Sequence, residues 1–235
     1  MIAGWIPRRG GAAGTMRHYH RACLSWTARL MGTRFVVPLF DEPLPSGGRK
    51  QPIAPPPLAR LEKRVRATSP KGRIMKDSPC RLLTGVPQSP VHHPEGDALQ
   101  HTLLVWWAAR RIAAREGLNG EPRRALLLAA LYHDLGKATC TQVHPDGRIT
   151  SHRHDERSAA LAGAAMRCYG VSHQLRHAVV ALCREHMHAR ELLSARARAR
   201  LERRLYDSGV ALHLLMLLVE ADTAGRGNPA RATAD

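Results

Sequence analysis

The sequence predicts an all-α helical bundle that follows a basic and largely disordered N-terminal segment. Segments with helical periodicity follow one another from residue 97 onward, capping residues mark where most of them begin and end, and this region has no convincing strand pattern. With 235 residues, of which 44% are hydrophobic, the chain is long enough for one helical domain with its own core but marginal for two.

The N-terminal third of the chain has a different composition. Residues 1–74 hold 14 Lys or Arg against 3 Asp or Glu, together with nine of the 16 prolines. They show no sustained helical or strand period, so we expect disorder, with at best a short strand at 33–40. Residues 1–26 are rich in Arg and poor in acids, as transit peptides are, and a non-structural leader before Met75 is at least as good an interpretation. We expect the folded domain over 75–228 and a disordered tail over 229–235.

Six helical segments can be placed by their periodicity and their caps. Asp97 is a plausible N-cap of the first, Pro122 lies in the first turn of the second, Gly136 follows its end, and Ser172 caps the fourth. The fifth segment is amphipathic and has a heavily basic outer face. In chain order, the predicted helices lie within residues 97–116, 121–136, 154–170, 173–188, 191–207 and 208–225.

Six ionisable residues lie on apolar helix faces or at the end of an apolar helix. Burying an ionised carboxylate without a partner costs many kcal/mol, so two inward aspartates require a cation. Lys137 is one candidate for that cation. A metal ion is the other, because neutral imidazoles and carboxylates together suit zinc, manganese, iron or nickel. The six residues are His101, His154, His186 and Asp222 on apolar faces, and the adjacent His133 and Asp134 at the end of the second helix.

The cysteines and the hydropathy indicate a location. The five cysteines are odd in number, widely spaced and without a CxxC pair, which argues against a disulfide framework and against a thiolate zinc site. A reducing cytoplasm fits this pattern best. No run approaches 18 apolar residues, so we expect no membrane-spanning helix and no membrane partner.

Four blocks of sequence carry a resemblance to a known family. In chain order they are GVPQSPVHHPEGDALQHTLLVWWAA, LYHDLGKATC, GRITSHRHDERSAALA and LLVEADTAGR. They resemble the HD domain attached to bacterial CCA-adding tRNA nucleotidyltransferases, which belongs to the HD superfamily of metal-dependent phosphohydrolases. The resemblance covers roughly residues 80–228 and implies an HD-domain helical bundle.

The resemblance also implies a divalent metal centre, with Mn, Ni, Fe, Zn or Mg as the ion. His154 and His186 would either complete a site for a second ion, bridged by Asp134, or contact phosphate beside a single ion. The residues implied to hold the first ion are His101, His133, Asp134 and Asp222.

Further residues are candidates for catalysis or substrate binding. Asp134 and Lys137 are the catalytic candidates, and Lys137 either contacts a phosphate or is an ordinary lysine favoured by the helix dipole. Arg153, where the family tends to have glycine, either contacts phosphate or is solvated. Glu95 in the segment HHPEGD either orients a water molecule or a ribose, or belongs to the turn before the helix that Asp97 caps.

Hydrolysis follows from the resemblance, whereas nucleotidyl transfer does not. The polymerase head of CCA-adding enzymes has a glycine-rich segment before paired carboxylates, and residues 1–74 offer only Asp41 and Glu42 between prolines. We expect a phosphomonoesterase or phosphodiesterase in which a metal-activated hydroxide attacks a nucleotide or RNA-end phosphate.

An RNA- or tRNA-binding accessory domain with a structural or vestigial metal site is the alternative function. Its affinity would come from the arginines of SARARARLERR. Aromatic residues make up only 4% of the chain, too few for an extended base-stacking platform. The expected partners are therefore a phosphorylated small molecule or nucleotide, and RNA or tRNA.

Overall fold

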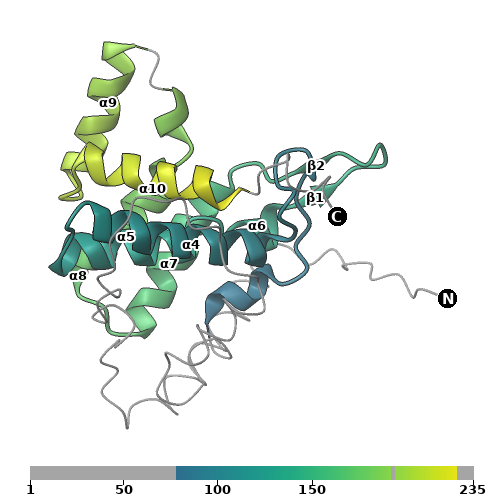
Figure 1. The fold of residues 1–235 in the computed structure, drawn as a ribbon, viewed down its shortest axis with the longest axis horizontal. Helices are drawn as coiled ribbons and strands as arrows, with labels where there is room; N and C mark the ends of the chain where they lie inside the picture. Colours follow the sequence, from purple (N-terminus) through teal and green to yellow (C-terminus); the bar gives the residue numbers. More distant parts are fainter. Residues whose placement is uncertain (1–77, 192–193, 227–235) are drawn as a thin grey trace, which may run out of the picture. The chain divides into compact units, whose positions relative to one another are not determined.

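The structure, a computed structural model, describes residues 78–191 and 194–226, which form a bundle of α-helices (Figure 1). The prediction of an all-α fold is confirmed, and no end of the six predicted helices differs from the observed one by more than four residues. The six helices are α4 (Ala98–Arg115), α5 (Gly120–Tyr132), α7 (His154–Cys168), α8 (His173–Glu185), α9 (Ala195–Tyr206) and α10 (Leu212–Gly225). The shorter elements are η2 (Pro79–Leu83), α6 (Lys137–Cys140), β1 (Gln142–Val143), β2 (Ile149–Thr150) and η3 (His188–Glu191).

Helix α5 lies at the centre of the bundle, because it packs against α4, α7, α8 and α10. Residues 125–130 of α5 are all buried, and Leu126 and Leu127 have no exposed surface. Each buried leucine side chain stabilises the fold by about 1.5–3 kcal/mol relative to an exposed one. The same helix ends at Tyr132 with His133 as its C-cap, so a largely buried helix delivers polar side chains to the interior of the bundle.

Two of the predicted caps are present. The Asp97 carboxylate accepts hydrogen bonds from the backbone N–H groups of Gln100 (2.8 Å) and Gly85 (2.7 Å), which ties the preceding loop to the start of α4. The Ser172 hydroxyl accepts one from Leu175 N–H at 3.4 Å. Such caps satisfy backbone donors that have no partner within the helix.

Gly136 follows α5 as expected, but for a different physical reason. Its φ of −63° is an ordinary helical value, so it is not the left-handed C-terminal glycine that the sequence suggests. A Cβ atom at Gly136 would instead overlap the carbonyl oxygen of His154 and approach Ser158 N to 2.8 Å. Glycine is needed here because α7 passes directly over the turn.

A second glycine allows a similar close approach between α10 and α4. A Cβ atom at Gly225 would lie 2.5 Å from a methyl carbon and 2.9 Å from the backbone nitrogen of Val105. The two glycines therefore bring α7 against the end of α5, and the end of α10 against α4.

A two-stranded antiparallel hairpin interrupts the helices and was not expected from the sequence. Gln142 pairs with Thr150 and Val143 with Ile149, around a turn that contains Pro145, Asp146 and Gly147. Strands of two residues are too short to show an alternating pattern, although a Pro-Asp-Gly segment is a turn signal.

Several expectations from the sequence concern residues outside the described ranges. These are the leader and the strand at 33–40, and the tail at 229–235. Among the described cysteines, Cys80, Cys140 and Cys183 are free thiols. No helix within the described ranges is long and apolar enough to cross a bilayer.

Arg153, just before α7, has a strained backbone conformation whose cost can be measured. Its φ of 55° and ψ of 28° lie in the left-handed region, which explains why glycine suits this position. The left-handed conformation costs a non-glycine residue about 1–2 kcal/mol, and glycine loses part of this advantage through its greater freedom in the unfolded chain. We expect Arg153→Gly to raise the free energy of unfolding by about 0.5–1 kcal/mol in urea denaturation.

Arg153→Ala is the matched control for this substitution. It removes the exposed 2.6 Å ion pair with Glu156, as Arg153→Gly does, but keeps a Cβ atom in the strained conformation. The alanine variant should be no more stable than the wild type. Equal stability of the two variants would contradict the explanation by strain.

Candidate metal centre

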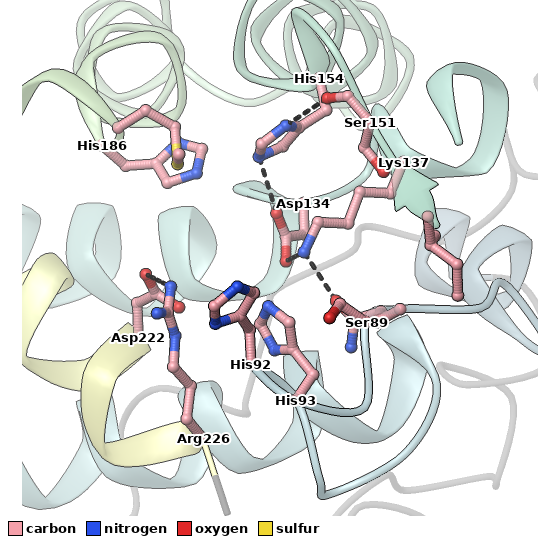
Figure 2. A pocket seen from close by; sticks show the side chains of 13 residues that line it. Ser89, His92, His93, Asp134, Lys137, Ser151, His154, His186, Asp222 and Arg226 are labelled. Carbon is pink, nitrogen blue, oxygen red and sulfur yellow. Dashed lines mark hydrogen bonds and ion pairs between the residues drawn. The ribbon is translucent and has the colours of Figure 1, made fainter. Parts of the chain in front are cut away.

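A cavity of about 380 Å³ lies beside the ends of α7, α8 and α10, next to the hairpin and the loop before α4 (Figure 2). Charged and imidazole side chains from the helix ends and from the loop before α4 line it, so the cavity is suited to a charged ligand. The lining includes Asp134, Lys137, His154, His186, Asp222 and Arg226.

The six implied ligand residues lie together, and four of them, Asp134, His154, His186 and Asp222, line this cavity. The six form two groups of three residues. Within each group, one potential ligand atom of each residue lies within 4.8 Å of the ligand atoms of the other two. Asp134 adjoins both groups: its Oδ2 is 3.3 Å from His133 Nε2 and 3.6 Å from His101 Nε2, and its Oδ1 is 3.2 Å from His154 Nε2. The first group is His101, His133 and Asp222, and the second is Asp134, His154 and His186.

In each of the four imidazoles, Nδ1 forms a hydrogen bond to an oxygen atom. In three of them it is the carbonyl oxygen three residues earlier, at 3.0 Å from His133, 2.8 Å from His154 and 2.8 Å from His186. In His101 it is the carboxylate of Glu95, at 2.7 Å. Because these oxygens accept, Nδ1 carries the proton in the neutral ring, and Nε2 has a free lone pair. Metal-binding histidines typically donate their other ring N–H to an oxygen in this way.

Local helix geometry explains two of these contacts. His133 and His186 are the C-cap residues of α5 and α8. The last carbonyl groups of a helix have no partner within it, and an imidazole N–H near that end can bond to one of them. The orientation of these two rings is thus held by contacts within their own helix ends.

Glu95 lies behind His101, outside the cavity lining. Its Oε1 accepts hydrogen bonds from His101 Nδ1 (2.7 Å) and from His93 Nδ1 (2.8 Å), and its side chain is 3% exposed. Glu95 is absent from the cavity lining, whereas His93 belongs to it. The carboxylate therefore holds two imidazoles in place.

Asp134 is held by a lysine at the cavity wall. Lys137 Nζ donates to Asp134 Oδ2 at 2.7 Å and to Gln88 Oε1 at 2.6 Å. Burial alone raises the pKa of Asp134, but the Lys137 ammonium and the His133 imidazole outweigh it and hold the pKa well below its usual range. The carboxylate is therefore ionised at neutral pH.

The pKa values of the neighbouring groups also respond to burial and to the carboxylates. Burial lowers the pKa of His186 to about 3, so this ring is neutral. Burial also acts to lower the pKa of His101, but hydrogen bonds to Asp222 and Glu95 raise it above its usual value. The pKa of Asp222 is lowered, because its hydrogen bond to His101 outweighs the effect of burial.

These donors fit a divalent ion. His133 Nε2 is buried and has no hydrogen-bond partner among the described residues, although it is 3.3 Å from Asp134 Oδ2. His101 has one proton in its neutral form, yet each of its nitrogens faces a carboxylate, Glu95 at 2.7 Å and Asp222 at 3.1 Å. A cation among the Nε2 atoms and the aspartates would satisfy these contacts, and the mixed N and O donors suit a borderline metal.

The structure does not bring Arg153 to the cavity. This side chain is 79% exposed and pairs with Glu156, which agrees with the solvated alternative. Two lining residues that sequence reasoning missed are Gln88, which holds Lys137, and Arg226, whose Nη2 is 3.3 Å from Asp222 Oδ2. Arg226 is four residues after Asp222, and this helical spacing was the signal that could have identified it.

The fold and the site together define an all-α domain with a candidate divalent-metal centre at its helix ends. The family model described as "HD domain" matches residues 98–217, which include five of the six ligand candidates. The chain therefore belongs to the HD domain family.

Similar curated proteins carry the name Multifunctional CCA protein. The protein from Alkalilimnicola ehrlichii is 35% identical over 149 residues, covering 61% of this chain and 33% of the relative. The one from Halorhodospira halophila is 38% identical over 115 residues (48% and 25%), and the one from Teredinibacter turnerae is 29% identical over 159 residues (66% and 35%). The chain thus spans about a third or less of the length of these relatives. No solved structure matches the chain.

Glu95→Gln tests the positioning of His101. An amide is a weaker acceptor than a carboxylate for two imidazole N–H groups. Loss of such a partner typically lowers metal affinity about 10- to 100-fold. We expect a decrease of that size in Mn²⁺ affinity, measured by titration calorimetry on chelator-treated protein, with an unchanged circular dichroism spectrum. Glu121→Gln, at an exposed site in the first turn of α5, is the control. Equal Mn²⁺ affinity in both variants would contradict the assignment.

Proposed function

We propose that the chain is a metal-dependent phosphohydrolase that acts on phosphomonoesters or phosphodiesters of nucleotides or RNA ends. The observation that carries this proposal is the meeting of four imidazoles, whose Nδ1 atoms are held by oxygens, with two buried carboxylates beside an open cavity. Membership of the HD domain family supports the same activity. A purely structural role for the cluster would not require a cavity next to it.

The residues that would hold the metal are the six already described, with Asp134 able to face two ions. A divalent ion supplies Lewis acidity when bound, which lowers the pKa of water from 15.7 to about 7 and screens negative charge on a phosphoryl group. The chain itself supplies the orientation of the donors, because helix ends and Glu95 hold the imidazole rings.

Two cationic side chains of the cavity suit a phosphate. Lys137 Nζ has three donors and uses two of them for Asp134 and Gln88, so one remains for a substrate oxygen. The Arg226 guanidinium has five N–H groups, and Figure 2 shows it across the cavity from Lys137. We assign Lys137 to the reacting phosphoryl group, because it also contacts Asp134.

The cavity volume bears on the class of substrate. A cavity of about 380 Å³ is at the lower end of the range for small-molecule sites, about 300–1,000 Å³. This space suits a mononucleotide or the terminal nucleotide of an RNA strand, and it is too small for a duplex. The name of the relatives, Multifunctional CCA protein, agrees with a nucleotide or RNA substrate.

The decisive experiment measures metal-dependent hydrolysis. The full chain, stripped of metal by a chelator, should be assayed with nucleoside 2'-, 3'- and 5'-monophosphates and 2',3'-cyclic phosphates, each with Mn²⁺, Ni²⁺, Fe²⁺, Zn²⁺ or Mg²⁺. We expect release of phosphate or ring opening only after addition of an ion, and its loss when the chelator is restored. Binding of ions without hydrolysis of any substrate in the panel would contradict the proposal.

Alanine substitutions at His133 and Asp134 test the ligand set. Each should abolish measurable hydrolysis and lower the bound metal determined by elemental analysis, because each removes a donor. The fold should persist in circular dichroism, since each substitution removes polar atoms and little apolar packing. His144→Ala, a substitution on the hairpin outside the cavity lining, should retain activity and metal.

Lys137→Met separates a catalytic lysine from one that is only favoured by a helix end. Removing one charged donor from a developing phosphoryl charge typically costs about 100- to 1,000-fold in kcat. We expect a loss of this size in kcat, with bound metal unchanged or increased, because Asp134 loses a competing cation. Retention of more than a tenth of the wild-type kcat would place Lys137 outside the catalytic machinery.

A further inference from the structure

Helix α9 contains two kinds of arginine, and one kind holds the helix in place. Arg204 forms a bidentate ion pair with Glu185 of α8, at 3.0 Å and 2.9 Å, and Glu185 is buried. Arg198 pairs with Glu202 one turn away, at 3.0 Å. Arg198 and Arg204 are therefore both paired with neighbouring carboxylates.

Arginines of the other kind have no ion pair or hydrogen bond to any described residue. They are Arg196, Arg200 and Arg203, here called the arginine face, and all three are exposed. Spacings of four and three residues place them on one side of the helix. The set spans about 10.5 Å along the axis, from the rise of 1.5 Å per residue. Three unpaired positive charges therefore form a row on the surface.

The opposite side of α9 is buried against the bundle. Leu201 is 1% exposed and Leu205 is 0% exposed, and the helix packs against α8, α10 and η3. The Ser194 hydroxyl caps its first turn by accepting from Ala197 N–H at 3.2 Å. The row of charges is thus presented on a fixed helix, and the apolar side of that helix is not available for insertion into a bilayer.

An exposed aromatic ring lies next to the arginine face. Tyr206 is 82% exposed and follows Arg203 by three residues, so the two side chains are neighbours on the helix surface. An exposed ring of this kind gives a flat surface on which an unstacked base can lie, and such stacking contributes to the binding of single strands irrespective of their sequence.

We propose that the arginine face of α9, together with Tyr206, binds a single-stranded segment of RNA. Arginine side chains recognise phosphate oxygens with paired N–H groups, and a row of them matches a regularly charged backbone. The neighbouring tyrosine favours a single strand, because duplex bases are not free to stack on it. This surface contains none of the residues assigned to the metal centre, so the inference goes beyond hydrolysis and stands independently of it.

The test compares the salt dependence of RNA binding between two triple variants of the full chain. The probe is a fluorescein-labelled single-stranded RNA of 15 nucleotides, with binding followed by anisotropy over a series of KCl concentrations. Each phosphate contact contributes about 0.7 to the slope of log K against log salt for single strands. Replacing all three arginines of the face by glutamine should reduce the slope by about 2 and weaken binding about 10- to 100-fold near 0.1 M KCl.

The matched control removes three exposed arginines that lie in different elements: Arg124→Gln, Arg148→Gln and Arg167→Gln together. It changes the net charge equally and leaves the strongly basic residues 1–74 in place, so the slope should stay within about 0.5 of the wild type. Replacement of the arginine face by lysine should retain the slope. Tyr206→Ala should weaken binding several-fold at an unchanged slope.

Several outcomes would overturn the proposal. One is wild-type RNA binding by the glutamine variant, and another is an equal loss in the control variant, which would indicate binding by general charge. A third is a glutamine variant that no longer binds vesicles containing phosphatidylserine but still binds RNA, which would indicate that this face binds a membrane surface.

Asp134→Ala and added EDTA should leave RNA binding unchanged, and hydrolysis of a mononucleotide should be unchanged in the glutamine variant. Failure of the hydrolase proposal is thereby distinguishable from failure of this one.

Discussion

Two buried carboxylates impose the constraint on which the rest of the domain depends. Asp134 and Asp222 are 2% and 4% exposed, and each has its pKa lowered, so the bundle encloses two negative charges. The penalty for removing such charges from water is several kcal/mol per ion unless opposite charge is close. Lys137 and Arg226 supply part of that charge, and a divalent ion would supply the rest. Binding of the ion would therefore stabilise the folded state as well as complete the metal centre.

The backbone is shaped so that these carboxylates meet the imidazoles. Gly136 lets the start of α7, and hence His154, approach the turn that carries Asp134. Gly225 does the same for α10 and α4, which bear Asp222 and His101. In both places a methyl group would separate the donors by pushing apart two backbones. Packing and chemistry are thus linked through two glycines that do not themselves face the cavity.

Local patterns in the sequence were sufficient to predict the helices and the inward direction of their polar side chains. Apolar periodicity placed His101 and Asp222 on buried faces because burial follows from the register of one helix. The role of Glu95 could not be predicted, since it depends on how the loop before α4 folds back against the first turn of that helix. The same limit applies to Gly136, whose neighbour across the turn is 18 residues further along the chain.

Lys137 connects the stability of the site with its proposed chemistry. Without a metal ion, its ammonium is the closest cation to Asp134 and is held in place by Gln88. A divalent ion beside the same carboxylate would take over the neutralisation of Asp134, and the charge of Lys137 would then act on whatever anion enters the cavity. Because Gln88 is a neutral acceptor, it can hold the lysine in either situation. One side chain can therefore compensate a buried charge and attract a phosphate in the hydrolase we propose.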